Sequence, residues 1–328
     1  MSNISIIGSG SWGTALAIHL SKNMHNVKMW SYSKEEADMI NNEKKCKFLP
    51  GVNLPDNIYC TLDFKEAIDN TEILLIVTPS KFVRETVRNF KQYVTEQKII
   101  ICSKGFEEET LYTLNEVVED ELPNSKIAGL SGPSHAEEVA VGIPTALVIA
   151  SKHIDLIEET QNVFANENLR IYASTDIKGA ELGGALKNIM ALCSGIVTGL
   201  NLGDNTIAAM LTRGLSEMAK LSIAMGGKTE TIYGLTGLGD LIVTCLSNHS
   251  RNRRAGILLG QGKTIQEAKK EIGMVIESID NIKTAYLLSK KYNVEMPIVN
   301  TVYEILFNNL EPIKAVQILM NRELKFED

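Results

Sequence analysis

The 328-residue sequence has little of what builds a disulfide framework or a metal centre. Its five cysteines are scattered and odd in number, and no two of them form a CxxC pair. Neither a zinc site nor a set of disulfides is therefore indicated. The five histidines form no HExxH or HxH motif, which leaves metal chemistry without support. We expect reduced thiols, a cytoplasmic location and no metal.

Membrane and nucleic-acid binding find little support either. No apolar run reaches the roughly 18 residues that span a bilayer, and the N-terminal apolar residues are typical of a first strand rather than a signal peptide. A net charge of −7 gives no reason to expect a broad nucleic-acid surface. Internal repeats are not evident, which argues against a solenoid. The length favours two domains, although it also suits one large domain.

What the sequence does have is a glycine-rich motif close to its N-terminus. An apolar run precedes Gly8-Ser9-Gly10-Ser11-Trp12-Gly13, and a segment with helical character follows it. Gly8 permits the turn, Gly10 lets the backbone approach a pyrophosphate, and Gly13 lets the helix pack close to the strand. The N–H groups of the helix N-terminus would then face the anion. The pattern predicts dinucleotide binding; the alternative is an ordinary glycine-rich turn.

The end of the second expected strand, Val27–Trp30, bears on which dinucleotide is bound. A carboxylate about 20 residues past the glycines binds the ribose hydroxyls of NAD. That place is occupied here by Ser31-Tyr32-Ser33-Lys34, and the first acid is Glu35. A missing acid permits the 2′-phosphate of NADP, and Lys34 could assist it, although no arginine is present. The segment favours NADP and leaves NAD open.

Further apolar runs predict the rest of a doubly wound α/β sheet. The runs Ile73–Val77 and Lys98–Cys102 are typical of central parallel strands that are covered on both faces. Their carboxyl ends deliver Thr78-Pro79 and Ser103-Lys104-Gly105 to the edge where ligands bind in open α/β sheets. Other strands are expected at 58–61, 127–130, 145–150 and 170–172, and helices at 63–68 and 83–94.

Near Asp176 the pattern changes to helical periodicity and stays helical to the end. We therefore expect a Rossmann-like domain over residues 1–175, followed by an all-α domain over residues 176–328. Later helices are expected at about 265–272, 279–292 and 297–308.

Two lysines stand out. Lys104 follows an apolar strand, and Lys187 lies in an otherwise apolar helical segment with small residues around it. Burial disfavours the charged form of a lysine, which suits it to proton transfer. The alternative for Lys187 is a side chain at the edge of the apolar face that extends to solvent.

The second half of the chain also contains two polar motifs. The glycine-rich loop 234–239 leads into Asp240, which shares a helix face with Thr244, four residues on. The alternative role for Asp240 is a helix N-cap. Ser250-Arg251-Asn252-Arg253-Arg254 combines an expected helix start with three guanidinium groups, as a phosphate ester would need. A solvated basic face is the alternative.

Six motifs converge on one family. The chain resembles bacterial NAD(P)-dependent glycerol-3-phosphate dehydrogenase over its whole length. The motifs that carry the resemblance are GSGSWGTALA at 8–17, SKGF at 103–106, GPSHA at 132–136, ALKN at 185–188, GLGDL at 237–241 and SRNRR at 250–254.

The resemblance implies the interconversion of sn-glycerol 3-phosphate and dihydroxyacetone phosphate, for phospholipid synthesis, by a homodimer. It implies that Lys187 is the proton donor or acceptor, that Asp240 holds it, and that Lys104 adds positive charge. The residues that it assigns to the cofactor are Gly8, Gly10, Ser11, Trp12, Gly13, Tyr32, Lys104, Ala136, Arg251, Val275 and Glu277. The residues that it assigns to the substrate are Lys104, Gly132, Ser134, Lys187, Asp240, Thr244, Ser250, Arg251 and Asn252.

Three positions depart from the family pattern. Tyr32 stands where many members carry a basic cofactor-binding residue, His135 replaces a phenylalanine, and Ser278 replaces a glycine after Glu277. Two other functions stay open. One is a dehydrogenase of a similar fold that acts on a hydroxy acid or a sugar acid phosphate. The other is a cofactor-sensing regulator without turnover, which would leave Lys104, Lys187 and Asp240 unexplained.

Overall fold

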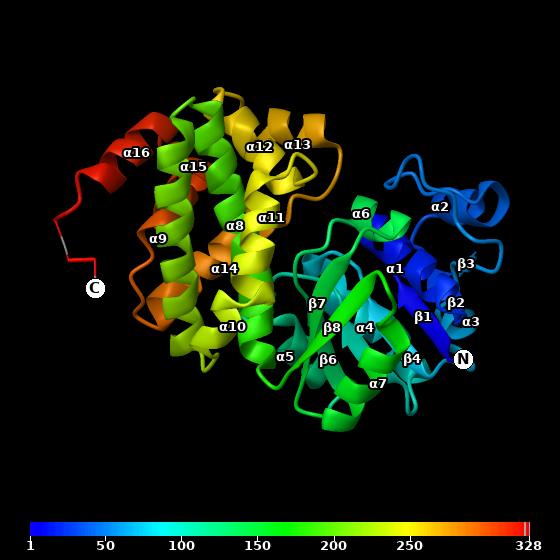
Figure 1. Cartoon of the computed structure of the whole chain (residues 1–328). Coiled ribbons are helices and arrows are strands. Elements are labelled where there is room, and N and C mark those ends of the chain that lie inside the picture. Colours follow the sequence, from blue (N-terminus) through cyan, green and yellow to red (C-terminus); the bar gives the residue numbers. More distant parts are fainter. Residues whose placement is uncertain (325, 328) are drawn as a thin grey trace. The chain divides into compact units, whose positions relative to one another are not determined.

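The computed structural model describes residues 1–324, 326 and 327. The chain divides into two compact units, Met1–Glu181 and Leu182–Asp328 (Figure 1). The division lies inside the long helix α8 (Ile177–Gly199), which begins one residue after Asp176.

The described part of the first unit is built on an eight-stranded sheet with the strand order β3-β2-β1-β4-β5-β6-β7-β8. Strands β1 to β6 are all parallel, and their order is that of a dinucleotide-binding doubly wound sheet, as the sequence predicts. The strands are β1 (Asn3–Ile7), β2 (Asn26–Trp30), β3 (Tyr59–Thr61), β4 (Ile73–Ile76), β5 (Lys98–Ile101), β6 (Ile127–Ser131), β7 (Thr145–Ser151) and β8 (Leu169–Ser174).

Alternating side chains attach the sheet to two layers of helices. Ile6 and Leu75 belong to one buried core, whereas Ile7 and Leu74, their neighbours in the chain, belong to the other. Successive residues of a strand point to opposite faces, so a strand covered on both sides needs an uninterrupted apolar run. The first core contains residues of α1 (Ser11–Lys22), α6 (Ala136–Val141) and α7 (Ile154–Phe164), and the second contains residues of α3 (Phe64–Ile68), α4 (Val83–Phe90) and α5 (Leu114–Glu121).

Two details of this unit differ from the sequence-based expectation. The helix expected at 83–94 ends at Phe90 and continues as one tight turn, Lys91–Tyr93. Strand β7 pairs antiparallel with β6, so the sheet is mixed at this edge. Because of this reversal, the chain that leaves β6 at Gly132 lies against the beginning of β7, at Ala146 and Leu147.

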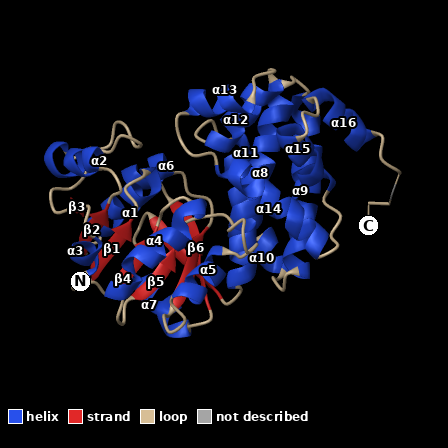
Figure 2. Cartoon of the chain, turned by 180° about the vertical axis from the view of Figure 1, so that it is seen from behind, coloured by secondary structure: helices blue, strands red, loops and turns tan. Residues whose placement is uncertain are grey.

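The described residues of the second unit form helices and connecting segments, and Figure 2 shows the strands confined to the first unit. The expected all-α character of the second domain is therefore confirmed. Besides most of α8, its helices are α9 (Gly203–Ala224), α10 (Thr229–Tyr233), α11 (Asp240–Leu246), α12 (Arg251–Gly260), α13 (Ile265–Ile272), α14 (Glu277–Lys291), α15 (Pro297–Phe307) and α16 (Pro312–Met320). By length and composition α8 could span a membrane, but 89% of its most apolar window is buried inside the protein, as in a core helix.

Helices α8 and α12 touch backbone to backbone. A Cβ atom on Gly195 of α8 would lie 2.0 Å from the carbonyl oxygen of Arg253, and one on Gly256 of α12 would lie 2.0 Å from that of Leu192. Any side chain at either position would push the helices apart. The contact fixes the position of α12 relative to the C-terminal third of α8.

A buried carboxylate holds the beginning of α15. Glu217 on α9 is 4% exposed, and it accepts hydrogen bonds from the backbone N–H groups of Ile298 and Val299 at 2.7 and 3.2 Å. These groups have no partner within their own helix because they lie in its first turn. Burial raises the pKa of Glu217 to about 7, although the two hydrogen bonds oppose the shift.

We predict that replacing Glu217 changes how stability depends on pH. The ordinary pKa of this carboxyl is 4.5. As pH rises, the unfolded chain therefore ionises before the folded chain does, and wild-type stability is lost between pH 4.5 and about 7. Glutamine cannot ionise, so this loss is absent from the Glu217→Gln variant. Across the interval, the free energy of unfolding of the variant should therefore rise relative to that of the wild type by up to about 3 kcal/mol.

Urea unfolding of both proteins across this pH range measures the difference in their free energies of unfolding. The exposed Glu230 on α10 supplies the control variant, Glu230→Gln, which should follow the wild type. A Glu217→Gln difference that stays constant with pH would contradict the prediction.

Candidate active site

The glycine motif forms the turn from β1 into α1. Gly8 has φ 126°, and a Cβ atom there would lie 2.9 Å from the backbone of Val77. A Cβ on Gly13 would lie 2.1 Å from the carbonyl oxygen of Gly8. On Gly10, by contrast, it would meet no described atom within 4 Å, so a ligand can approach the turn there. These residues suit the pyrophosphate of a dinucleotide, because α1 begins directly after Gly10 with N–H groups to offer.

The segment after β2 is arranged differently from its sequence-based interpretation. Tyr32, expected at the cofactor, is 92% exposed. Ser33 caps α2 (Lys34–Asp38), and this short helix turns the chain back toward β1. The carboxylate of Glu36 consequently lies 2.6 Å from the hydroxyl of Ser9, inside the glycine motif, and 3.3 Å from that of Ser31. Sequence reasoning missed Glu36 because only folding of α2 brings it to the end of β2.

The ends of β5 and β6 bring three expected substrate residues together. The ammonium of Lys104 donates a hydrogen bond to the carbonyl oxygen of Gly132 at 3.0 Å. The hydroxyl of Ser134 donates to the same oxygen, also at 3.0 Å. Ala136 follows as the first residue of α6, with His135 as its N-cap. The carboxyl edge of the parallel strands therefore carries the Lys104 ammonium beside the turn that contains Gly132 and Ser134.

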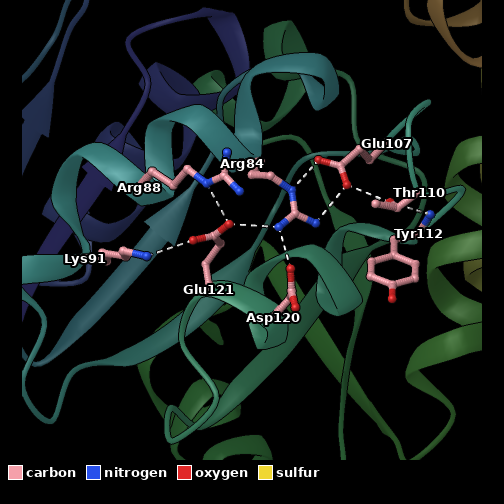
Figure 3. A network of polar contacts seen from close by, with 8 residues as sticks. All are labelled: Arg84, Arg88, Lys91, Glu107, Thr110, Tyr112, Asp120 and Glu121. Atoms are coloured by element: carbon pink, nitrogen blue, oxygen red, sulfur yellow. Dashed lines mark hydrogen bonds and ion pairs between the residues drawn. The ribbon is translucent and has the colours of Figure 1, made fainter.

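An ion-pair network anchors the segment that carries Lys104 (Figure 3). The guanidinium of Arg84, on α4, binds both carboxylate oxygens of Glu107 at 2.6 and 2.8 Å. It also donates to Asp120 at 2.5 Å and to Glu121 at 2.8 Å, both on α5. Glu107 lies three residues after Lys104, so the fork of Arg84 ties this segment to two helices.

Glu121 is the second centre of this network. It also accepts hydrogen bonds from Arg88 and Lys91, at 2.7 and 2.9 Å (Figure 3). Burial by itself would raise the pKa of Glu121, but hydrogen bonds from these two residues and Arg84 outweigh it and hold the pKa at about 2. The carboxylate therefore stays ionised throughout the ordinary pH range.

In the second unit, Lys187 forms a buried ion pair with Asp240. Its ammonium lies 2.9 Å from Asp240 Oδ1 and donates to the hydroxyl of Thr244 at 2.6 Å. Thr244 in turn donates to Asp240 Oδ1 at 3.2 Å. The side chains of Lys187 and Asp240 are 9% and 2% exposed. The ammonium thus ends inside the protein, and the Asp240 carboxylate is occupied with Lys187 and Thr244.

The local sequence explains how Asp240 reaches this position. A single π-helical turn, Leu235–Gly239, leads directly into α11, and Gly239 occupies the N-cap position. Asp240 is therefore the first residue of α11, and Thr244 lies one turn later on the same face. Such irregular helical turns are frequent at functional sites.

The basic motif forms the beginning of α12. Ser250 is its N-cap, with the hydroxyl oxygen accepting from the backbone N–H of Arg253 at 3.2 Å. Arg251 donates to the carbonyl oxygen of Val275 at 3.0 Å, just before α14 begins at Glu277. This places three of the expected residues around one helix start, where N–H groups and a guanidinium could serve an anion.

Asn252 has protein partners on both sides of its amide. Its nitrogen donates to Asn188 Oδ1 at 2.9 Å, and its oxygen accepts from the backbone N–H of Ser278 at 3.0 Å. Asn252 is 8% exposed. It therefore joins α8, α12 and the start of α14, and contact with a substrate stays a prediction for this residue. Sequence reasoning missed Asn188, which directly follows Lys187.

We predict that the two-point binding of Glu107 by the Arg84 guanidinium stabilises the fold beyond what a single positive charge at this position would contribute. Lysine keeps the charge but cannot bind Glu107 at two points, so Arg84→Lys should lower the free energy of unfolding by about 2–3 kcal/mol. Arg88, which is 60% exposed, provides the matched control, Arg88→Lys, with an expected loss below about 1 kcal/mol. Denaturant unfolding gives both values, and equal losses would contradict the prediction.

Comparison with known proteins assigns both halves of the chain to one family. Residues 3–157 match the family model described as NAD-dependent glycerol-3-phosphate dehydrogenase N-terminus, and residues 176–317 match the corresponding C-terminus model. A protein of Fusobacterium nucleatum named glycerol-3-phosphate dehydrogenase [NAD(P)+] is 52% identical, over 100% of this chain and 99% of its own. A protein of Agathobacter rectalis with the same name is 48% identical, over 100% and 98%.

A solved structure agrees with these matches. The crystal structure of glycerol-3-phosphate dehydrogenase from Coxiella burnetii superimposes with a TM-score of 0.95 at 39% identity, and covers 98% of this chain and 99% of that one. The fold, the sequence motifs found in each unit and these similarities all point to one conclusion. The chain belongs to the NAD-dependent glycerol-3-phosphate dehydrogenase family.

Proposed function

We propose that this chain reversibly interconverts sn-glycerol 3-phosphate and dihydroxyacetone phosphate with NAD(P) as the hydride carrier. The observation that carries the proposal is the buried Lys187–Asp240 pair, in a chain whose relatives bear this activity in their names. A regulator without turnover would give no reason to bury an ammonium and a carboxylate together, since desolvating two charges is costly.

Lys187 is the acid in the direction that forms the alcohol. When bound, a reduced nicotinamide would supply the hydride, and negative charge would then develop on the C2 oxygen of dihydroxyacetone phosphate. The Lys187 ammonium stabilises this oxygen and donates a proton to it, and in the opposite direction the neutral amine accepts the proton. Asp240 pairs with this ammonium and, with Thr244, fixes its orientation. Lys104 adds a second positive charge to the electrostatic environment of the reaction.

The beginning of α12 is the proposed phosphate-binding element. Ser250, Arg251 and Asn252 lie at a helix N-terminus, where backbone N–H groups and a guanidinium favour an anion. Gly132 and Ser134 are further proposed contacts of the substrate. A dehydrogenase of a hydroxy acid is the second candidate, since an arginine binds a carboxylate as well as a phosphate.

The remaining assignments extend the proposal. The dinucleotide is held by Gly8, Gly10, Ser11, Trp12 and Gly13, with further contacts from Tyr32, Lys104, Ala136, Arg251, Val275 and Glu277. We propose a homodimer that supplies glycerol 3-phosphate to phospholipid synthesis in the cytoplasm. The five cysteines are all buried and in the thiol form, which suits a reducing compartment. The preference for NADPH suggested by Ser31–Lys34 stays a prediction, and Glu36 weighs against it.

A spectrophotometric assay at about 340 nm tests the activity, because reduced nicotinamide absorbs there and its oxidised form does not. The purified protein is given dihydroxyacetone phosphate with NADH and, in parallel, with NADPH. We expect oxidation that depends on the triose phosphate. Matched 2-oxo acids serve as controls, and activity with them but not with dihydroxyacetone phosphate would favour the second candidate. Cofactor binding without oxidation of either cofactor would favour a regulator.

We predict that Arg251→Ala mainly weakens substrate saturation. Each charge-assisted hydrogen bond contributes about 1.5–3 kcal/mol, so KM for dihydroxyacetone phosphate should rise about 10- to 100-fold while kcat changes less. Arg254 is an exposed arginine of the same helix, and Arg254→Ala should leave KM within about twofold. An unchanged KM in Arg251→Ala, with cofactor binding intact, would remove Arg251 from the phosphate site.

A further inference from the structure

We propose that Glu36 discriminates between the two cofactors by favouring NAD(H) and opposing the 2′-phosphate of NADP(H). The inference deepens the proposed function, since it concerns the dinucleotide of that reaction. It also opposes the preference for NADPH that the segment Ser31–Lys34 suggests.

The position of Glu36 is fixed from two sides. Its backbone N–H donates to the hydroxyl of Ser33, the N-cap of α2, at 3.4 Å. Its Oε2 atom accepts from Ser9 at 2.6 Å and from Ser31 at 3.3 Å. Ser9 and Ser31 are 6% and 1% exposed, and their hydroxyls lie 2.7 Å from each other. Two buried hydroxyls therefore hold the carboxylate at a defined place, although it arrives from a helix and not from the strand itself.

This place is where a Rossmann-like unit reads the ribose. Ser9 belongs to the glycine turn and Ser31 directly follows β2, so Glu36 lies between the turn that faces the pyrophosphate and the strand end that faces the adenosine. Among the described residues, both side-chain hydrogen bonds of this carboxylate go to Oε2. Oε1 is thus able to accept a ribose hydroxyl, as the acid directly after β2 does in NAD-binding members of this fold.

The charges around the site decide which cofactor gains. A 2′-phosphate carries up to two negative charges, so a carboxylate fixed at the ribose repels it. In NADP the 2′-hydroxyl is also replaced by this phosphate, so the carboxylate no longer has a ribose 2′-hydroxyl from which to accept a hydrogen bond. Lys34 could attract the phosphate, but its side chain is exposed and solvated, so its charge is screened. Tyr32 is uncharged and 92% exposed. The fixed carboxylate therefore dominates over the solvated ammonium.

The variant Glu36→Gln tests the proposal because the amide keeps an oxygen for Ser9 and Ser31 but loses the charge. Glu35 provides the matched control, since it lies next in the same helix, is 72% exposed and approaches only to 3.8 Å of Lys47. Binding constants for NADH and NADPH are measured by nucleotide fluorescence without substrate, and kcat/KM is measured with each cofactor.

We expect the NADPH-to-NADH ratio of association constants to rise about tenfold or more in Glu36→Gln, and to stay within about twofold in Glu35→Gln. The variant Glu36→Lys, which adds a cation, should move the ratio further in the same direction and provides a second, independent test. A ratio that stays constant, or an equal loss of affinity for both cofactors, would overturn the proposal and leave Glu36 with the purely structural task of holding α2. Because the ratio is obtained without turnover, it tests Glu36 even if dihydroxyacetone phosphate proves not to be the substrate.

Discussion

The ion pair between the Lys187 ammonium and the Asp240 carboxylate is largely withdrawn from solvent within the helical unit, since the two side chains are only 9% and 2% exposed. Removing two charges from water costs several kcal/mol for each ion, and only close contact and further hydrogen bonds offset that cost. The Thr244 hydroxyl adds two such hydrogen bonds, because it accepts one from Lys187 and donates one to Asp240. The unit must therefore hold α8 and α11 in one fixed register, because a small displacement would leave each charge buried without compensation.

The surrounding packing meets this demand. The backbone contact between α8 and α12, at Gly195 and Gly256, leaves no room for the two helices to shift. Asn252 joins α8 to the start of α14 through Asn188 and Ser278. In the first unit, Arg84 binds both carboxylate oxygens of Glu107 and so anchors the segment that carries Lys104. In both units, contacts within the protein therefore hold in place the segments that carry the residues of the proposed site.

Much of this arrangement is local in the sequence and could be predicted from it. Uninterrupted apolar runs such as Ile73–Val77 predict the parallel strands, the spacing of Gly8, Gly10 and Gly13 predicts the turn, and the four-residue separation of Asp240 and Thr244 places them on one helix face. Contacts between distant segments could not be predicted. The antiparallel pairing of β7, the approach of Gly195 to Gly256 and the return of Glu36 to Ser9 all depend on tertiary packing, of which a single sequence carries no direct signal. The proposed roles of individual residues come from family resemblance together with these contacts.

A double-mutant cycle on kcat tests most directly whether Lys187 and Asp240 act as one catalytic unit. Lys187→Ala should lower kcat by about 10²–10⁴, as expected for loss of a positioned acid. If Asp240 acts only through Lys187, then Asp240→Asn should add almost nothing to that loss in the double variant, while the affinity for reduced cofactor stays close to that of the wild type. Multiplicative losses in the double variant, or near-normal turnover without Lys187, would contradict the account.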